Sequence, residues 1–183
     1  MISRIGRDRI GRDRGAELTQ RAQLPLLDRL IDDAPDVQRD PPLSMAEAVA
    51  LLRRSVRRDI EALLNARRRW RSWPDGYREL AVSPVGYGVI DFAAGAFNDP
   101  EQRDRLRAGI EQTIRRFEPR LAQVRVILVD SDNIQEATLR LRIEAFLQVE
   151  PAPEPIVFDT LIDPATAEVQ VKPNSADHPS SDV

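Results

Sequence analysis

Apolar residues recur at helical spacing in a first long stretch of the chain. Ser44 and Glu47 have the spacing of a capping box, which predicts that a helix begins at this point. The apolar positions that follow form one stripe along the helix: Val49, Leu52, Val56, Ile60 and Leu63. The pattern predicts that this helix ends between Asn65 and Arg69.

A second helix is predicted between Asp99 and Glu118. Asp99 suits the cap position, and Pro100 suits the first helical position. One face of the helix is apolar, with residues at steps of three and four: Leu106, Ile110, Thr113, Ile114 and Phe117. Pro119 has no backbone N–H and disfavours helical geometry at Glu118, so the helix should end there.

Glu118 and Arg120 flank Pro119, between this helix and the strand expected after it. The proline holds two opposite charges at a rigid corner. Taken alone, such a tripeptide is most simply a helix stop with two solvated charges. Other segments of the chain change this interpretation, as described below.

The last third of the chain alternates in the manner of strands. Residues 124–129 begin this region, and residues 139–149 alternate apolar and mostly polar positions most regularly. Two further segments, 156–162 and 168–172, predict a hairpin around residues 163–166. The order of elements predicts an α+β fold, with helices packed on one face of a mostly antiparallel sheet.

A short amphipathic segment precedes the first long helix. Its apolar face consists of Leu26, Leu27, Leu30 and Ile31. So short a helix is marginal alone and must dock, either on its own domain or in a partner's groove. We therefore divide the chain into a disordered tail (1–23), a docking helix with a proline-rich linker (24–43), a folded domain (44–172) and a second disordered tail (173–183).

Composition limits the classes of function. The 183 residues are 42% hydrophobic and 31% charged, which suits one soluble domain with polar tails. The sequence shows neither a membrane-length apolar run nor a secretion signal. It contains no cysteine, and its single histidine, His178, lies in the polar C-terminal tail. We expect no cofactor, no metal site and no catalytic residue, in a cytoplasmic protein.

A basic stretch raises the alternative of nucleic-acid binding. Residues 51–71 contain eight arginines and two acidic residues. Trp70 lies between the last two arginines, and Trp73 follows them. Cations mixed with aromatic rings can bind single-stranded nucleic acid. We favour a helix end at which cations meet exposed carbonyls, because no RNA-binding or helix-turn-helix pattern accompanies the run.

Five segments of the chain together resemble a known family. They are residues 26–30, 55–67, the Tyr87-Gly88 loop ending at Phe92, residues 117–121, and residues 143–160 with the run Glu-Pro-Ala-Pro-Glu-Pro. In this order they resemble TssE, the baseplate wedge subunit of type VI secretion systems. TssE is similar to a tailed-phage baseplate wedge protein once labelled a lysozyme. Departures from the usual family residues occur at Ala66, Gly86, Ile90 and Ala167, where the family has Thr, Asn, Pro and Gly.

The resemblance implies a structural subunit and not an enzyme. It places the protein in the cytoplasm, at the base of a membrane-anchored apparatus, with baseplate partners TssF, TssG and TssK and sheath subunits TssB and TssC. We expect no small-molecule substrate and no insertion into the membrane. Partner contacts are expected at two places: the corner Glu118, Pro119 and Arg120, and the docking residues Leu26, Leu27 and Leu30. The strands 139–149, 156–162 and 168–172 would offer an edge on which the first sheath ring assembles.

The family's old label raises a third reading, a lysozyme-like glycosidase. That chemistry needs two carboxylates across a cleft, one of them protonated in an apolar setting. The acidic residues available are Glu118, Glu144, Glu150 and Glu154, and no pairing among them stands out from the sequence.

Overall fold

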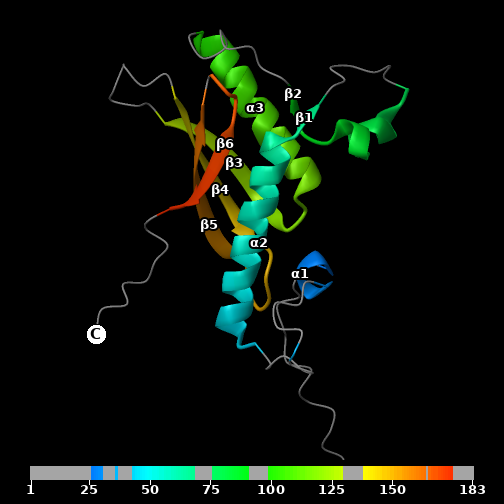
Figure 1. Cartoon of the computed structure of the whole chain (residues 1–183), viewed down its shortest axis with the longest axis vertical. Helices are drawn as coiled ribbons and strands as arrows, with labels where there is room; N and C mark the ends of the chain where they lie inside the picture. The colour runs from blue at the N-terminus through cyan, green and yellow to red at the C-terminus, as the bar shows by residue number, and fades with distance from the viewer. Residues whose placement is uncertain are drawn as a thin grey trace, which may run out of the picture.

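A computed structural model describes residues 26–30, 36, 43–68, 76–90, 99–129, 138–163 and 165–174 (Figure 1). Its helices are α1 (Leu26–Leu30), α2 (Met45–Asn65) and α3 (Pro100–Phe117), with 3-10 turns η1 (Arg78–Ala81) and η2 (Pro84–Gly86). Its strands are β1 (Arg67–Arg68), β2 (Val89–Ile90), β3 (Leu121–Val129), β4 (Leu139–Leu147), β5 (Glu154–Ile162) and β6 (Val169–Pro173). The predicted α+β fold is confirmed.

Local capping residues set the ends of the two long helices. At the start of α2, the Ser44 N–H donates to Glu47 Oε2 at 2.8 Å, and the Glu47 N–H donates back to Ser44 Oγ at 3.3 Å. At the start of α3, the Glu101 N–H donates to Asp99 Oδ1 at 3.0 Å. The last backbone bond of α3 runs from the Glu118 N–H to the Ile114 carbonyl. The two predicted long helices are confirmed. They could be predicted because capping signals act between residues close together in the sequence.

The main sheet is an antiparallel meander in the order β3-β4-β5-β6. Strand β3 starts at Leu121, three residues before the predicted start. Gln123 has a left-handed φ of 52°, and the register with β4 shifts at this point. This bulge places both Leu121 and Val124 in the core although two residues separate them. Strict alternation therefore could not predict the first three residues of β3.

The other strand ends differ from prediction by one or two residues. Strand β4 ends at Leu147, whereas the alternation continues to residue 149; beyond the strand, the Gln148 N–H bonds to the Arg120 carbonyl at 2.8 Å. Strand β5 begins two residues early, and β6 spans 169–173 where 168–172 was predicted. A parallel two-stranded sheet of β1 and β2 was not predicted, because two-residue strands carry no periodic signal.

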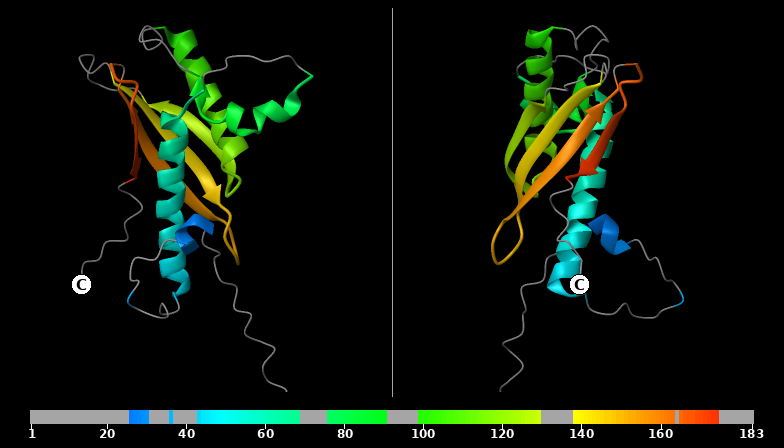
Figure 2. Two further views of the ribbon diagram at one scale, coloured as in Figure 1. Left: turned by 45° about the vertical axis from the view of Figure 1, so that its right-hand side comes forward. Right: turned by 90° about the vertical axis from the view of Figure 1, so that its left-hand side faces the viewer.

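Both long helices lie against one face of the sheet (Figures 1 and 2). Their apolar stripes meet the inward side chains of all four strands in a single core, whose fully buried members include Ile60, Ile110, Ile143 and Ile162. Helix α3 contacts the outer strand β3, and α2 contacts the opposite outer strand β6. Each helix thus runs beside one edge of the sheet.

Several sequence-based predictions lie outside the described residues. They concern the tail 1–23, Ile31, the run 69–75 with both tryptophans, the end of the Tyr87 loop at Phe92, and the C-terminal tail from residue 175 with His178. Among the residues that are described, no helix combines the length and apolar character that crossing a membrane requires.

The hairpin between β5 and β6 contains a strained alanine that can be tested. Ala167 adopts φ 56°, the left-handed region that glycine enters without cost. We expect Ala167→Gly to increase the free energy of unfolding by about 1 kcal/mol, measured by urea denaturation. Ala165→Gly, at an exposed position of the same turn, is the matched control and should not stabilise. Equal changes in the free energy of unfolding for the two substitutions would show that the backbone at Ala167 is not strained.

Candidate partner-binding site

The corner between α3 and β3 contains a buried ion pair. Glu118 is 4% exposed, whereas Pro119 lies at the surface. The Arg120 Nε donates to Glu118 Oε1 at 2.6 Å, and its Nη2 donates to Glu118 Oε2. The Arg120 N–H also points to Glu118 Oε1, at 3.3 Å. The two side chains therefore bind each other, and the most exposed residue of the corner is Pro119.

Helix α2 completes the surroundings of Arg120. The Arg120 Nη2 lies 2.7 Å from Asp59 Oδ2, and the Arg120 Nη1 donates to Ser55 Oγ at 3.3 Å. Burial disfavours the guanidinium charge, but the hydrogen bonds and charges of Glu118 and Asp59 outweigh it and raise the pKa of Arg120 above its ordinary value. Arg120 is thus a permanently charged link between the corner and α2.

The same network reaches α1 through Asp28. Its Oδ2 accepts a hydrogen bond from Ser55 Oγ at 2.6 Å, and its Oδ1 lies 2.7 Å from Arg58 Nη1. The hydrogen bond from Arg58 lowers the pKa of Asp28, against the opposing effect of burial, and the bond from Ser55 lowers it further. Since Arg58 also pairs with Asp59, one continuous chain of charges joins α1 to the corner.

This anchoring leaves the apolar side of α1 in solvent. Leu26, Leu27 and Leu30 are 68%, 57% and 72% exposed. A helix held to its domain by one carboxylate, with three leucines turned outward, has an apolar face without a cover among the described residues. One polar network therefore joins the corner to α1, the helix that carries the three leucines. The leucines and the corner do not contact each other directly in the described interactions.

A cleft of about 390 Å³ opens beside the corner. Its lining residues are Asp59, Leu63, Tyr87, Phe117, Glu118, Pro119 and Arg120. The Tyr87 and Phe117 rings meet edge to face at 5.3 Å. Gly88, with φ 97°, fixes the Tyr87 loop, since a Cβ there would lie 2.3 Å from the Ala66 carbonyl oxygen. The cleft thus has an aromatic wall and a charged wall.

Sequence reasoning proposed the corner and the leucines as partner-binding residues, but it did not predict their supports. These are Asp28, Ser55, Arg58 and Asp59. One signal was present: Ser55 lies next to Val56 in the apolar stripe of α2 and is 3% exposed. A buried hydroxyl requires partners, so a polar residue inside such a stripe indicates a buried polar contact. Two of its partners, Asp28 and Arg120, could not be identified, because they lie 27 and 65 positions away in the sequence.

The buried pair makes the corner a determinant of stability. Arg120→Ala leaves the Glu118 carboxylate buried without its main partner, which should lower the free energy of unfolding by about 3 kcal/mol. Chemical denaturation measures the effect. The double variant Glu118→Gln/Arg120→Met removes both charges and should recover most of the loss; an Arg120→Ala variant as stable as wild type would contradict the pairing.

The anchor of α1 can be tested separately. Asp28→Ala removes the contacts to Ser55 and Arg58, although alanine is a better helix former than aspartate. We expect faster amide hydrogen exchange in residues 26–30 and unchanged exchange in α2 and the sheet. Asp36→Ala, at an exposed acidic position nearby, is the control and should leave residues 26–30 unaffected. Unchanged exchange in the Asp28 variant would rule out this anchor.

Comparison with known proteins gives the family. A search of curated proteins gives no match to this sequence. The model of the family described as baseplate wedge protein gp25 matches residues 50–152, more than half of the 183 residues. The matched region runs from α2 to the turn before β5 and includes the whole corner. The family resemblance seen in the sequence is confirmed, and the chain belongs to the baseplate wedge protein gp25 family.

Proposed function

We propose that the chain is a TssE-type wedge subunit of a type VI secretion baseplate, where it joins wedge partners and starts the contractile sheath. Membership of a family of baseplate wedge proteins carries the coarser part of this proposal, a structural role in a phage-tail-like baseplate. The finer part assigns TssF, TssG and TssK as wedge partners and TssB and TssC as sheath partners. The site of action would be the cytoplasm, at the base of the membrane-anchored apparatus.

The exposed leucines of α1 support a wedge contact. Three leucines on one short helix, tied to the domain only by Asp28 in the described contacts, suit insertion into an apolar groove of a partner. Burying each should contribute about 2 kcal/mol. We propose that residues 24–43 form a docking segment and that residues 44–172 form the wedge domain behind it.

At the corner, the contact to a partner would be made through Pro119 and the outer side of Arg120. Pro119 is exposed at the rim of the 390 Å³ cleft. Because Glu118 is buried, it would act by holding Arg120 in place rather than by touching the partner. This assigns the three corner residues different parts in one contact.

The sheet supports a role in sheath assembly. In the meander, β4 and β5 are paired on both sides, so β6 is the outer one of the three C-terminal strands and β3 is the other edge of the described sheet. An outer strand can accept an additional strand from another chain. A subunit at the base of a polymer could use this property to order the first ring.

The glycosidase reading gains no support from the corner. Both Glu118 oxygens accept hydrogen bonds from Arg120, so neither is free to protonate a glycosidic oxygen. The nucleic-acid reading is weakened in a similar way. Arg53 pairs with Glu154, Arg58 with Asp28, and Arg57 donates to the Val171 carbonyl, so these cations serve internal contacts.

Co-purification tests the proposed function. The chain is co-expressed with TssF, TssG, TssB and TssC from the same locus and isolated by an affinity tag. Leu26→Asp/Leu30→Asp should reduce recovery of a wedge partner at least tenfold, because charges replace two leucines that the proposed contact would bury. Pro119→Glu tests the corner without breaking the buried pair. Gln112→Glu, an exposed change on α3, is the control. A folded wild-type chain that retains none of these proteins would refute the proposal.

A further inference from the structure

The Ser55 hydroxyl is the point at which the corner and α1 are connected. Ser55 lies on the buried side of α2 and is 3% exposed. Its Oγ donates to Asp28 Oδ2 at 2.6 Å and accepts from Arg58 Nη2 and Arg120 Nη1, both at 3.3 Å. A hydroxyl has one proton and two acceptor positions, so this side chain is fully used. The two arginines occupy the acceptor positions, which leaves the single proton for α1.

The Ser55 hydroxyl does not follow the usual pattern of a hydroxyl inside a helix. Ser and Thr side chains in helices commonly donate to the carbonyl four residues earlier in the same helix. Thr113 on α3 does so, and its Oγ1 donates to the Gly109 carbonyl at 2.8 Å. Ser55 instead donates to a residue 27 positions away, on another helix. The difference indicates that Ser55 serves a contact between helices rather than its own helix.

Ser55 provides the shielded half of the anchor that holds α1. The other half is the ion pair between Asp28 and Arg58, whose side chains are 20% and 44% exposed. Solvent screens such partly exposed pairs, so they contribute little to stability. The bond from the buried Ser55 hydroxyl is protected from water by comparison. Its strength depends on Arg120, because a guanidinium that donates to the hydroxyl oxygen polarises the O–H toward its acceptor.

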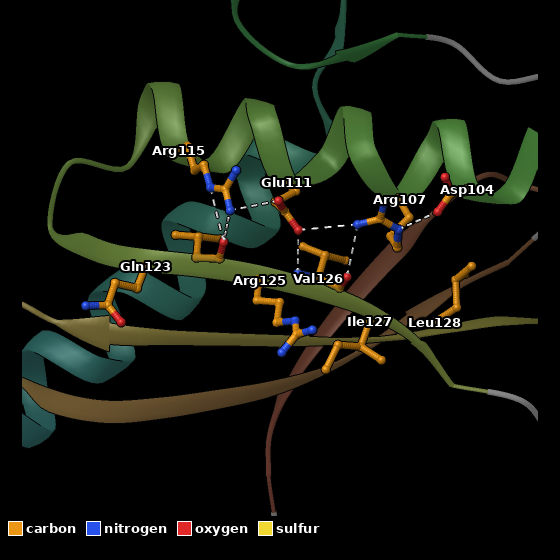
Figure 3. A pocket seen from close by; sticks show the side chains of 10 residues that line it. Asp104, Arg107, Glu111, Arg115, Gln123, Arg125, Val126, Ile127 and Leu128 are labelled. Carbon is orange, nitrogen blue, oxygen red and sulfur yellow. Dashed lines mark hydrogen bonds and ion pairs between the residues drawn. The ribbon is translucent and has the colours of Figure 1, made fainter.

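The corner is the fixed end of this connection, and α1 is the end that can move. The Arg120 carbonyl accepts from the Gln148 N–H at 2.8 Å, just beyond the end of β4. Helix α3 is also tied to β3, since Arg115 Nη2 donates to the Val124 carbonyl at 2.6 Å (Figure 3). Helix α1 has five residues, and in the described contacts Asp28 alone links it to the domain by hydrogen bonds. A change at the corner can therefore alter how firmly α1 is held.

We propose that Ser55 is a positioning residue that couples the corner to the docking helix. An intact pair of Glu118 and Arg120 keeps the Ser55 hydroxyl in its orientation. Through Asp28, the same hydroxyl keeps the three leucines of α1 in place for a wedge partner. So short a helix is marginal alone, and one that is already anchored binds more tightly than one that must first form and orient. The inference rests on the proposed function for the partner, whereas the connection inside the chain does not.

Coupling of this kind acts in both directions. A partner that holds the leucines also holds Asp28, and it would thereby strengthen the hold of Ser55 on Arg120. Contacts at the corner and at α1 would therefore form cooperatively, although the two places do not touch each other in the described interactions. A loss of assembly on changing Arg120 would then come partly from a loosened α1, and not only from a lost contact at the corner.

Hydrogen exchange in the free chain tests the connection. The corner variant, Glu118→Gln/Arg120→Met, removes the donor to Ser55 and leaves the hydrogen bonds to Asp28 in place. We expect amide exchange in residues 26–30 to become about threefold faster, because one hydrogen bond of the anchor is weakened. Exchange in α2 and the sheet should stay unchanged, which shows that the fold is intact. Wild-type exchange in residues 26–30 of this variant would overturn the coupling.

Ser55→Ala removes the connection itself. Exchange in residues 26–30 should become about fivefold faster than in wild type, because one hydrogen bond of the anchor is lost. Adding the corner variant to Ser55→Ala should have no further effect on these amides. Thr113→Ala removes a hydroxyl that bonds to its own helix, and it is the matched control. A corner effect that persists at full size without the Ser55 hydroxyl, or wild-type exchange in Ser55→Ala, would overturn the role of Ser55.

Binding to wedge partners gives the functional readout. The dissociation constant for a complex of TssF and TssG is measured with wild type, Asp28→Ala, the corner variant and their combination. Each change should weaken binding several-fold, and the combined loss should fall short of the product of the two single losses. Losses that multiply fully would overturn the coupling and keep the proposed function. A folded wild-type chain that binds neither protein would refute the proposed function, and exchange in the free chain would still decide whether Ser55 connects the corner to α1.

Discussion

The paired charges of Glu118 and Arg120 are the constraint on which much of this structure depends. A carboxylate that is 4% exposed is stable only with a charged partner, and Arg120 supplies it while also reaching Asp59 on α2. The pair therefore fixes the end of α3, the start of β3 and the position of α2 at once. Through Asp59 and Arg58 the same network continues to Asp28, which holds α1 with its leucines outward. The sequence suggests two solvated charges at this corner, whereas in the structure they pair with each other and connect α3, β3 and α2.

The sheet shows a second use of charged side chains. Each long helix uses one polar side to complete the hydrogen bonds of an outer strand, while its apolar side fills the core. Glu61 and Glu111 have equivalent positions in these two contacts, each accepting from a valine N–H whose carbonyl is bound by an arginine four residues earlier on the helix. Among the arginines of α2, Arg57 makes such a contact, whereas Arg53 and Arg58 form ion pairs with Glu154 and Asp28. Closed edges would keep the free chain from associating with itself.

Local chemistry accounts for what could be predicted. The capping box at Ser44, the Asp99-Pro100 start and the Pro119 stop determined the two long helices, because each acts within one turn of the chain. Alternation identified β4 throughout and failed at the beginning of β3, where Gln123 introduces a bulge. The corner residues and the three leucines were proposed as the site from their local setting and from the family resemblance. Their supports on α2 were not, because nothing near them in the sequence indicates which partner they meet.

The sequence by itself determined the helix ends, the α+β class and the family resemblance, since these depend on residues close together or on motifs in order. Only the tertiary structure decided which charges are internal. Asp28 meets Ser55 across 27 positions, Arg120 meets Asp59 across 61, and Glu61 meets Val171 across 110. Whether a glutamate is solvated or closes a sheet edge depends on which strand the folded chain places beside it. Periodicity places such a residue on the polar side of a helix, and only the packing of that helix against the sheet gives it a partner.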